Sequence, residues 1–187
     1  ISSEQFIATG SVEKYGAGGK DAFLAAFNQD GSIAWSMVFG QAGEEISYSI
    51  CVLKHAGNSG YLLAGSSMST DSMTSRFLLA RFSSQGTLVW TKIMNGVRTD
   101  AAYSVIETQD GNALIAGTVH SYGVGSSDGF VIKVDMDGNR LWAKTVGGVD
   151  AEAGPLEGGV QVAVEFARLP GQVAMRPFEQ RQRRGGG

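Results

Sequence analysis

Hydrophobic residues gather along the chain in short segments of five to seven residues, rich in Val, Ile, Phe, Tyr and Thr. Gly, Asp, Asn or Ser bounds each segment, and no window keeps an apolar period of 3.6 residues. This pattern is typical of β-strands and not of helices. The sequence therefore predicts an all-β protein.

The segments recur with one long period. Trp35, Trp90 and Trp142 are 55 and then 52 residues apart. Two sets of glycines keep the same two intervals, namely Gly31, Gly86 and Gly138, and Gly10, Gly65 and Gly117. The fullest copy of the repeat has four strand-like segments, Ala102–Thr108, Ala113–Thr118, Gly129–Asp135 and Arg140–Val146. A fixed period of this length indicates a repeat architecture.

The repeat unit predicts a four-stranded antiparallel sheet. Asp30-Gly31, Asp110-Gly111 and Asp137-Gly138 lie between adjacent segments, where a two-residue hairpin needs a left-handed backbone. Segments such as Leu62–Ala64 are apolar on both faces, so each sheet is expected to be covered on both sides. A sheet of this size that is covered by copies of itself is the blade of a β-propeller. A parallel β-helix needs a shorter repeat without hairpin glycines, and a β-sandwich does not explain the period.

The predicted organisation is a β-propeller-type array of about three blades. It comprises a partial blade at 1–39, full blades at 46–94 and 101–147, and a divergent tail at 151–187. The tail is predicted to add two strands of a further blade before a disordered Arg/Gly end, or to be an unrelated continuation. Because a ring needs about 4 to 8 blades, we expect an incomplete or open ring unless other chains complete it. The expected arrangements are a homo-oligomer or a piece of a longer propeller, and the start at Ile1 without Met indicates a processed or internal segment.

The segment DGFVIKVDMDGNRLWAKTVGG at 128–148, together with DAAYSVIETQDGNALIAGT at 100–118, resembles the bacterial SBBP-type β-propeller repeat family. The resemblance extends over about residues 6–150. It implies a propeller fold in secreted or surface-associated proteins, and hence an extracellular or cell-surface location. The second copy departs from the pattern, because Arg76 stands where the other copies have Asp21 and Asp128.

Composition and charge exclude several functions. The net charge is −3, so the folded body is not expected to bind nucleic acid. No segment approaches the about 20 apolar residues of a membrane span. Charged residues make up only 18% of the chain, whereas the 27 glycines are about twice the usual share, which favours many tight turns.

Catalytic and metal chemistry find little support in the sequence. His55 and His120 are out of phase in the repeat, and the single cysteine, Cys51, is expected to be a small buried apolar group. Residues 135–139 resemble the start of a calcium loop, but Arg140 and its successors do not continue the ligand pattern, so a hairpin turn is the better interpretation. We therefore predict no catalytic residue, no cofactor and no metal site.

Two sets of repeated side chains have structural and functional interpretations. The three tryptophans are predicted to fill the space between neighbouring sheets, not to form a ligand cage. Four carboxylates precede or open the first strands of the units and are predicted to cap loop amides, with an acid–base pair as the alternative. They are Glu44, Glu45, Asp100 and Asp150.

The longest loops are predicted to emerge on one face and to carry recognition. They are 11–20, 67–75 and 119–127 within units, and 40–45, 95–100 and 147–159 between units. The residues expected to contact a partner are Lys14, Tyr15, Arg98, His120 and Tyr122. The predicted function is non-catalytic, either binding of a protein or glycan on this loop face or an assembly scaffold. The alternative is a fragment of a propeller enzyme such as a quinone-dependent dehydrogenase.

Overall fold

The chain forms strands throughout the regions that can be described. The computed structural model describes residues 5–71, 74–94, 99–120 and 128–146, and within these ranges it contains eleven β-strands and no helix. The all-β prediction is therefore confirmed. The predicted tail at 151–187 lies outside the described residues. The strands are β1 (Phe6–Glu13), β2 (Lys20–Phe27), β3 (Ile33–Phe39), β4 (Glu44–Leu53), β5 (Gly60–Met68), β6 (Ser75–Phe82), β7 (Leu88–Met94), β8 (Ala101–Glu107), β9 (Ala113–Val119), β10 (Asp128–Val134) and β11 (Arg140–Val146).

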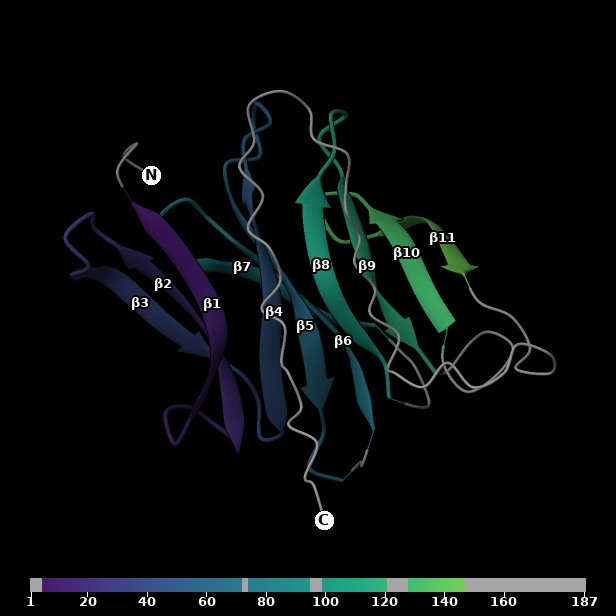
Figure 1. The fold of residues 1–187 in the computed structure, drawn as a ribbon, viewed down its shortest axis with the longest axis horizontal. Helices are drawn as coiled ribbons and strands as arrows, with labels where there is room; N and C mark the ends of the chain where they lie inside the picture. The colour runs from purple at the N-terminus through teal and green to yellow at the C-terminus, as the bar shows by residue number, and fades with distance from the viewer. Residues whose placement is uncertain (1–4, 72–73, 95–98, 121–127, 147–187) are drawn as a thin grey trace, which may run out of the picture.

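The strands make three antiparallel sheets in which neighbours in the chain are neighbours in space (Figure 1). The first sheet is β1–β2–β3, the second is β4–β5–β6–β7, and the third is β8–β9–β10–β11. Several strands are longer than the sequence predicted. For example, β1 continues to Glu13 because Val12 and Glu13 pair with Asp21 and Lys20.

The hairpin turns differ from the predicted two-residue type. In the β10–β11 turn, Gly138 N–H donates to the Asp135 carbonyl at 3.0 Å, and Asp135 N–H donates to the Asn139 carbonyl at 3.0 Å. Gly138 has a φ of 73°, so the turn is a three-residue loop whose last residue is left-handed. Residues 28–32, 83–87 and 108–112 repeat this bonding. A glycine is needed at this position, as predicted. It is the third residue of the loop, however, and the pairing of β10 with β11 shifts by one residue next to it, as in a β-bulge.

The second sheet lies between the other two and is buried on both faces. One face carries Tyr61, Leu63 and Phe82 toward the first sheet. The other carries Leu62 and Leu79 toward the third sheet. Each such side chain contributes about 1.5–3 kcal/mol by leaving water, so these two interfaces are the main source of stability. The expectation that this sheet is covered on both sides is confirmed.

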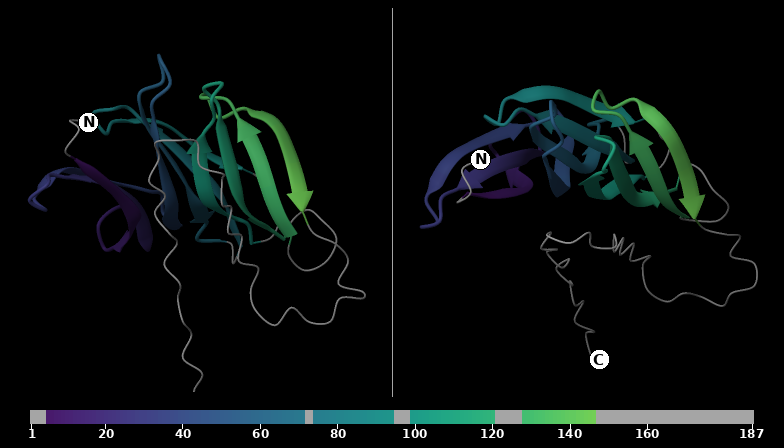
Figure 2. Two further views of the ribbon diagram at one scale, coloured as in Figure 1. Left: turned by 45° about the horizontal axis from the view of Figure 1, so that its top comes forward. Right: turned by 90° about the horizontal axis from the view of Figure 1, so that it is seen from above.

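The three sheets form a curved row and, within the described residues, no closed ring (Figure 2). The first strands of the two four-stranded sheets, β4 and β8, lie side by side on the inside of the curve (Figure 2). Two backbone N–H groups at the open edge of β8 donate to side chains of β4: Val105 N–H to Ser49 Oγ at 3.2 Å, and Glu107 N–H to Cys51 Sγ at 3.1 Å. The edge strand of one sheet is thus capped by its neighbour, which limits pairing with other chains. The first sheet has no strand equivalent to β4 and β8 among the described residues.

Candidate functional site

The loops that join sheets and the loops within sheets meet on one face of the row, at one end of the strands. Gly19 N–H donates to the Gly43 carbonyl at 3.0 Å, which joins the β1–β2 loop to the connection between the first and second sheets. Gly43 in turn lies against Met68, where an added Cβ would be 1.8 Å from the carbonyl oxygen. Only glycine allows this approach. The described parts of both predicted loop sets therefore lie on the same face, which we call the loop face.

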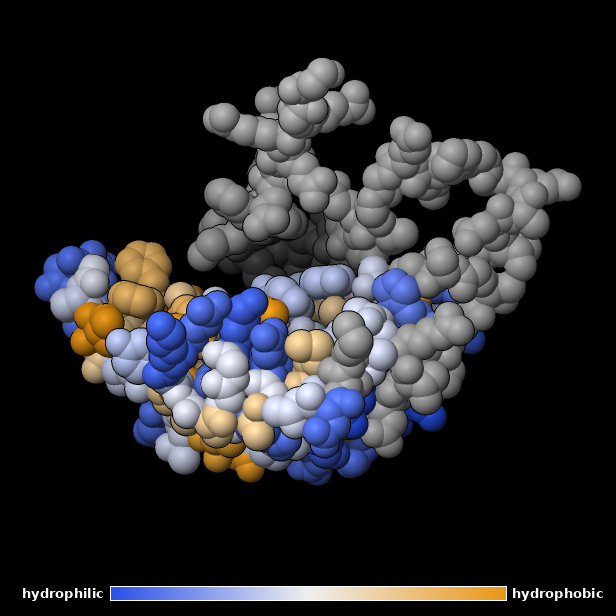
Figure 3. All heavy atoms as spheres, turned by 90° about the horizontal axis from the view of Figure 1, so that it is seen from below, coloured by the Kyte–Doolittle hydropathy of each residue, from blue (hydrophilic) through white to orange (hydrophobic). Residues whose placement is uncertain are grey.

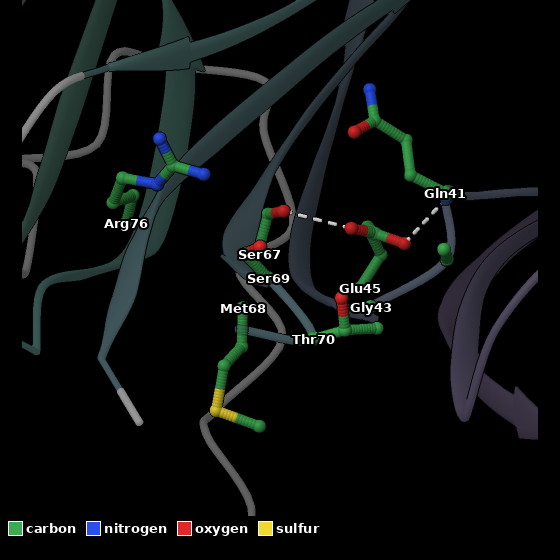
Figure 4. A pocket seen from close by; sticks show the side chains of 9 residues that line it. Gln41, Gly43, Glu45, Ser67, Met68, Ser69, Thr70 and Arg76 are labelled. Atoms are coloured by element: carbon green, nitrogen blue, oxygen red, sulfur yellow. Dashed lines mark hydrogen bonds between the residues drawn. The ribbon is translucent and has the colours of Figure 1, made fainter. Parts of the chain in front are cut away.

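Two buried carboxylates hold the loop face together between the first and second sheets. Asp21 is fully buried and accepts hydrogen bonds from Ala17 N–H at 3.3 Å and Gly18 N–H at 3.5 Å. Glu45 is 3% exposed and accepts from Gln41 N–H and Ser67 Oγ–H, each at 2.7 Å (Figure 4). Such charge-assisted bonds to loop amides are stronger than neutral ones.

A single carboxylate forms a similar cap in the third sheet. Asp100, which occupies the position of Glu45 in the repeat, accepts a hydrogen bond from His120 N–H at 2.8 Å. The predicted use as caps on loop amides is confirmed for Glu45 and Asp100, and it stays a prediction for Glu44. Asp150, which was also predicted to cap loop amides, lies outside the described residues.

A glycine lies between the two buried carboxylates. Gly40 separates the carboxylates of Asp21 and Glu45, since an added Cβ there would lie 2.2 Å from Asp21 Oδ1 and 2.7 Å from Glu45 Oε2. The structure thus brings two carboxylates from different sheets together, but both are buried and occupied by loop donors.

A small polar pocket opens beside Glu45 on the loop face (Figure 4). Its volume is about 100 Å³, well below the about 300 Å³ of the smallest typical ligand sites. The pocket has room for a few waters or one polar group. Its lining residues are Gln41, Ala42, Gly43, Glu45, Ser67, Met68, Ser69, Thr70 and Arg76.

The predicted contact residues fall at different places on the loop face. Lys14 and Tyr15 share the β1–β2 loop, where both are exposed, Tyr15 to 72%. His120 follows β9 in the third sheet and is partly buried. Arg98 and Tyr122 lie outside the described residues.

Sequence reasoning missed an exposed aromatic pair on the inside of the curve. Tyr48 of β4 and Tyr103 of β8 are each 44% exposed, and their ring centroids are 5.0 Å apart. Each tyrosine is the extra residue of a β-bulge, which turns its side chain out of the regular alternation. A hydrogen bond of 3.3 Å from Ser66 Oγ–H to the Tyr48 hydroxyl orients one of the two rings. The Tyr-Ser dipeptide that recurs at 48–49 and 103–104 was the sequence signal that could have predicted this pair.

The histidines and the acidic turns offer no converging metal ligands. Within the described ranges, no three His, Cys, Asp or Glu side chains are grouped to hold an ion. The Asp135 carboxylate accepts from Asp137 N–H at 3.0 Å and Asn139 N–H at 2.8 Å, so it braces its own turn. The Asn139 hydrogen bonds are the main cause that lowers the pKa of Asp135. The hairpin interpretation of this turn is confirmed.

Cys51 is expected to be a poor nucleophile. Burial raises the pKa of its thiol to about 11. At pH 8 the thiolate fraction is then about 0.001, compared with about 0.2 for a free cysteine of pKa near 8.5. Alkylation by iodoacetamide at pH 8 should therefore be at least about 100-fold slower in the native protein than in urea. Mass spectrometry measures both alkylation rates. Equal rates in the native protein and in urea would contradict the burial of the Cys51 thiol.

Comparisons with known proteins establish no family. No family model matches the chain, and no curated protein matches it. Among solved structures, the chain is similar to a protein of unknown function from Bacteroides caccae, with 19% identity and a TM-score of 0.45. The match covers 76% of this chain and 41% of that one, so this chain spans less than half the length of that protein. None of the described segments is a helix long and apolar enough to cross a membrane.

Proposed function

We propose that the chain is a non-catalytic β-propeller-type repeat module that binds a glycan through its loop face and the Tyr48–Tyr103 pair. The three stacked antiparallel sheets and the resemblance of residues 6–150 to SBBP-type repeats support a propeller-type array. The same resemblance supports an extracellular or cell-surface location. The loops held by buried carboxylates are rigid enough to present contacts.

The tyrosine pair is the observation that carries this proposal. Two half-exposed rings, 5.0 Å apart and tilted by 51°, present apolar ring surface, and the Tyr48 hydroxyl accepts a hydrogen bond from Ser66. Such rings suit the faces of sugars, which combine C–H patches with hydroxyl groups, and tyrosine is also common where a protein partner binds. Both rings are set by bulges, and bulges are frequent next to functional sites.

A glycan array followed by titration with the best ligand tests the proposal. Tyr103→Ala should weaken binding at least tenfold, because it removes one of the two rings. Val89→Ala is the matched control: Val89 is 54% exposed on the outer strand β7, and its truncation should leave binding within twofold. A glycan that binds the Tyr103→Ala and Val89→Ala variants equally would contradict a glycan platform. So would a chain that binds other proteins but no glycan. A stoichiometric chromophore or cation in the purified protein would contradict the non-catalytic assignment.

A further inference from the structure

A contact between a tryptophan and a glycine turn joins each pair of neighbouring sheets. An added Cβ at Gly86 would lie 2.6 Å from the Trp35 ring, and one at Gly138 would lie 2.9 Å from the Trp90 ring. In both cases the indole comes from the last strand of one sheet, and the glycine from the last hairpin of the next. Both glycines are buried by this contact.

Polar groups surround the indole at the second of these contacts. Trp90 Nε1–H and Arg81 Nη1–H donate to the Met136 carbonyl at 3.1 and 3.2 Å. Lys92 Nζ–H donates to Asn139 Oδ1 at 3.1 Å. In the third sheet, Lys133, Trp142 and Lys144 occupy the repeat positions of Arg81, Trp90 and Lys92, and the Lys133 ammonium is ion-paired with the Asp110 carboxylate.

One end of the row exposes a tryptophan of this kind, and the other end exposes a turn glycine of this kind. At one end, Trp142 is 42% exposed and all of β11 is exposed, unlike β3 and β7. At the other end, the turn glycine Gly31 is exposed, and nothing lies within 4 Å of its Cβ position. Gly31 is the counterpart of Gly86 and Gly138, and its φ of 82° gives it the same backbone.

The outer face of the first sheet has the residues of an interface. Phe23, Ala25 and Phe27 of β2 occupy the positions that Leu78, Ala80 and Phe82 hold in β6. The three β6 residues are at most 2% exposed beneath the first sheet, whereas Phe23 and Phe27 are only partly buried. Hydrophobic residues are also visible at this end of the molecule in Figure 3, and Phe6 and Ile33 are more than 60% exposed. Exposed apolar surface of this kind marks an interaction site.

We infer that a second copy of this chain docks head to tail, with Trp142 of one copy over Gly31 of the next. The partner is a second copy because one chain displays the indole half of the contact at one end and the glycine half at the other. Such a contact is heterologous, and it closes into a ring only if the rotation fits. Two copies of the three sheets that the structure describes would make six, which is within the range of about 4 to 8 for closed propellers. The inference rests on sheet stacking and not on the glycan site, so either can fail alone.

Sedimentation velocity of the full 187-residue chain tests the docking. The wild type should self-associate below about 100 μM. Trp142→Ala should weaken association at least tenfold. Leu141→Ala should not, because its counterpart Val89 stays 54% exposed next to the Trp90 contact. Gly31→Asn should also weaken it, because asparagine tolerates the left-handed backbone but fills the docking position. Gly57→Asn is its control, since Gly57 has a φ of 88° and nothing within 4 Å.

Mixing the two interface variants distinguishes this contact from others. The Gly31→Asn chain keeps Trp142, and the Trp142→Ala chain keeps Gly31, so one native contact can re-form between them. A heterodimer that forms more tightly than either variant alone supports the inference. A monomeric wild type, association unaffected by both variants, or the lack of any gain on mixing would overturn it.

Discussion

Replacing Gly65 with alanine is expected to destabilise the protein far more than the same change at Gly10, although the two glycines share one position in the repeat. An added Cβ at Gly65 would lie 1.9 Å from the Ile46 carbonyl oxygen. The strands β4 and β5 would have to separate at the bulge that sets Tyr48. We expect a loss of about 3 kcal/mol in the free energy of unfolding, at the upper end of overpacking costs. Urea denaturation followed by tryptophan fluorescence measures it.

Gly10 is the matched control because no strand lies on the open side of β1 among the described residues. A Cβ there meets only the Phe23 ring, with 2.8 Å to the nearest carbon. That ring can turn aside, so Gly10→Ala should cost less than about 1 kcal/mol. Equal losses of unfolding free energy in the two variants would show that the close approach of the neighbouring strand is not why glycine is needed at this position.

Trp90→Ala is expected to be the second large effect, with a loss of about 3 kcal/mol. The indole packs on the Gly138 turn and supplies one hydrogen bond to Met136, so truncation removes both a contact between sheets and a donor. Core Trp→Ala changes cost about 3–5 kcal/mol, and Trp90 is only partly buried, which places it at the lower end.

Trp90→Phe separates the two contributions. Phenylalanine keeps most of the packing but leaves the Met136 carbonyl with one donor fewer, and a single hydrogen bond is worth about 1 kcal/mol. We therefore expect a loss of about 1 kcal/mol by differential scanning calorimetry or urea denaturation. If Trp90→Ala were no worse than Trp90→Phe, the indole would not hold the second and third sheets together.

The positions of the strands could be predicted because they depend on local pattern. Alternating and apolar segments between turn residues predicted the positions of the described strands. The spacing of the tryptophans correctly placed Trp35 and Trp90 between sheets, but the same prediction was wrong for Trp142, which is 42% exposed. The length of the hairpin loops was wrong by one residue. The Asp-Gly signal suits a two-residue loop as well as a type I turn with a bulge, and only the pairing of the strands distinguishes them.

The site was less accessible to sequence reasoning. Glu45 and Asp100 could be predicted as caps from their phase, but not the Ser67 hydroxyl that completes the Glu45 site. The pairing of Tyr48 with Tyr103 required two bulges in separate sheets to face each other. Neither the bulges nor the approach of β4 to β8 is encoded in a short window of sequence.

By itself, the sequence determined the secondary structure and the repeat, because period, turn glycines and apolar segments act over a few residues. Only the tertiary structure decided which copies of a repeated residue are buried against a neighbouring sheet and which are exposed. Trp142, Gly31 and Gly10 match their counterparts in sequence, yet differ from them in exposure or contacts. The reason is physical: in a row of stacked sheets, burial depends on having a neighbour, and among the described residues the sheets at the two ends each lack one.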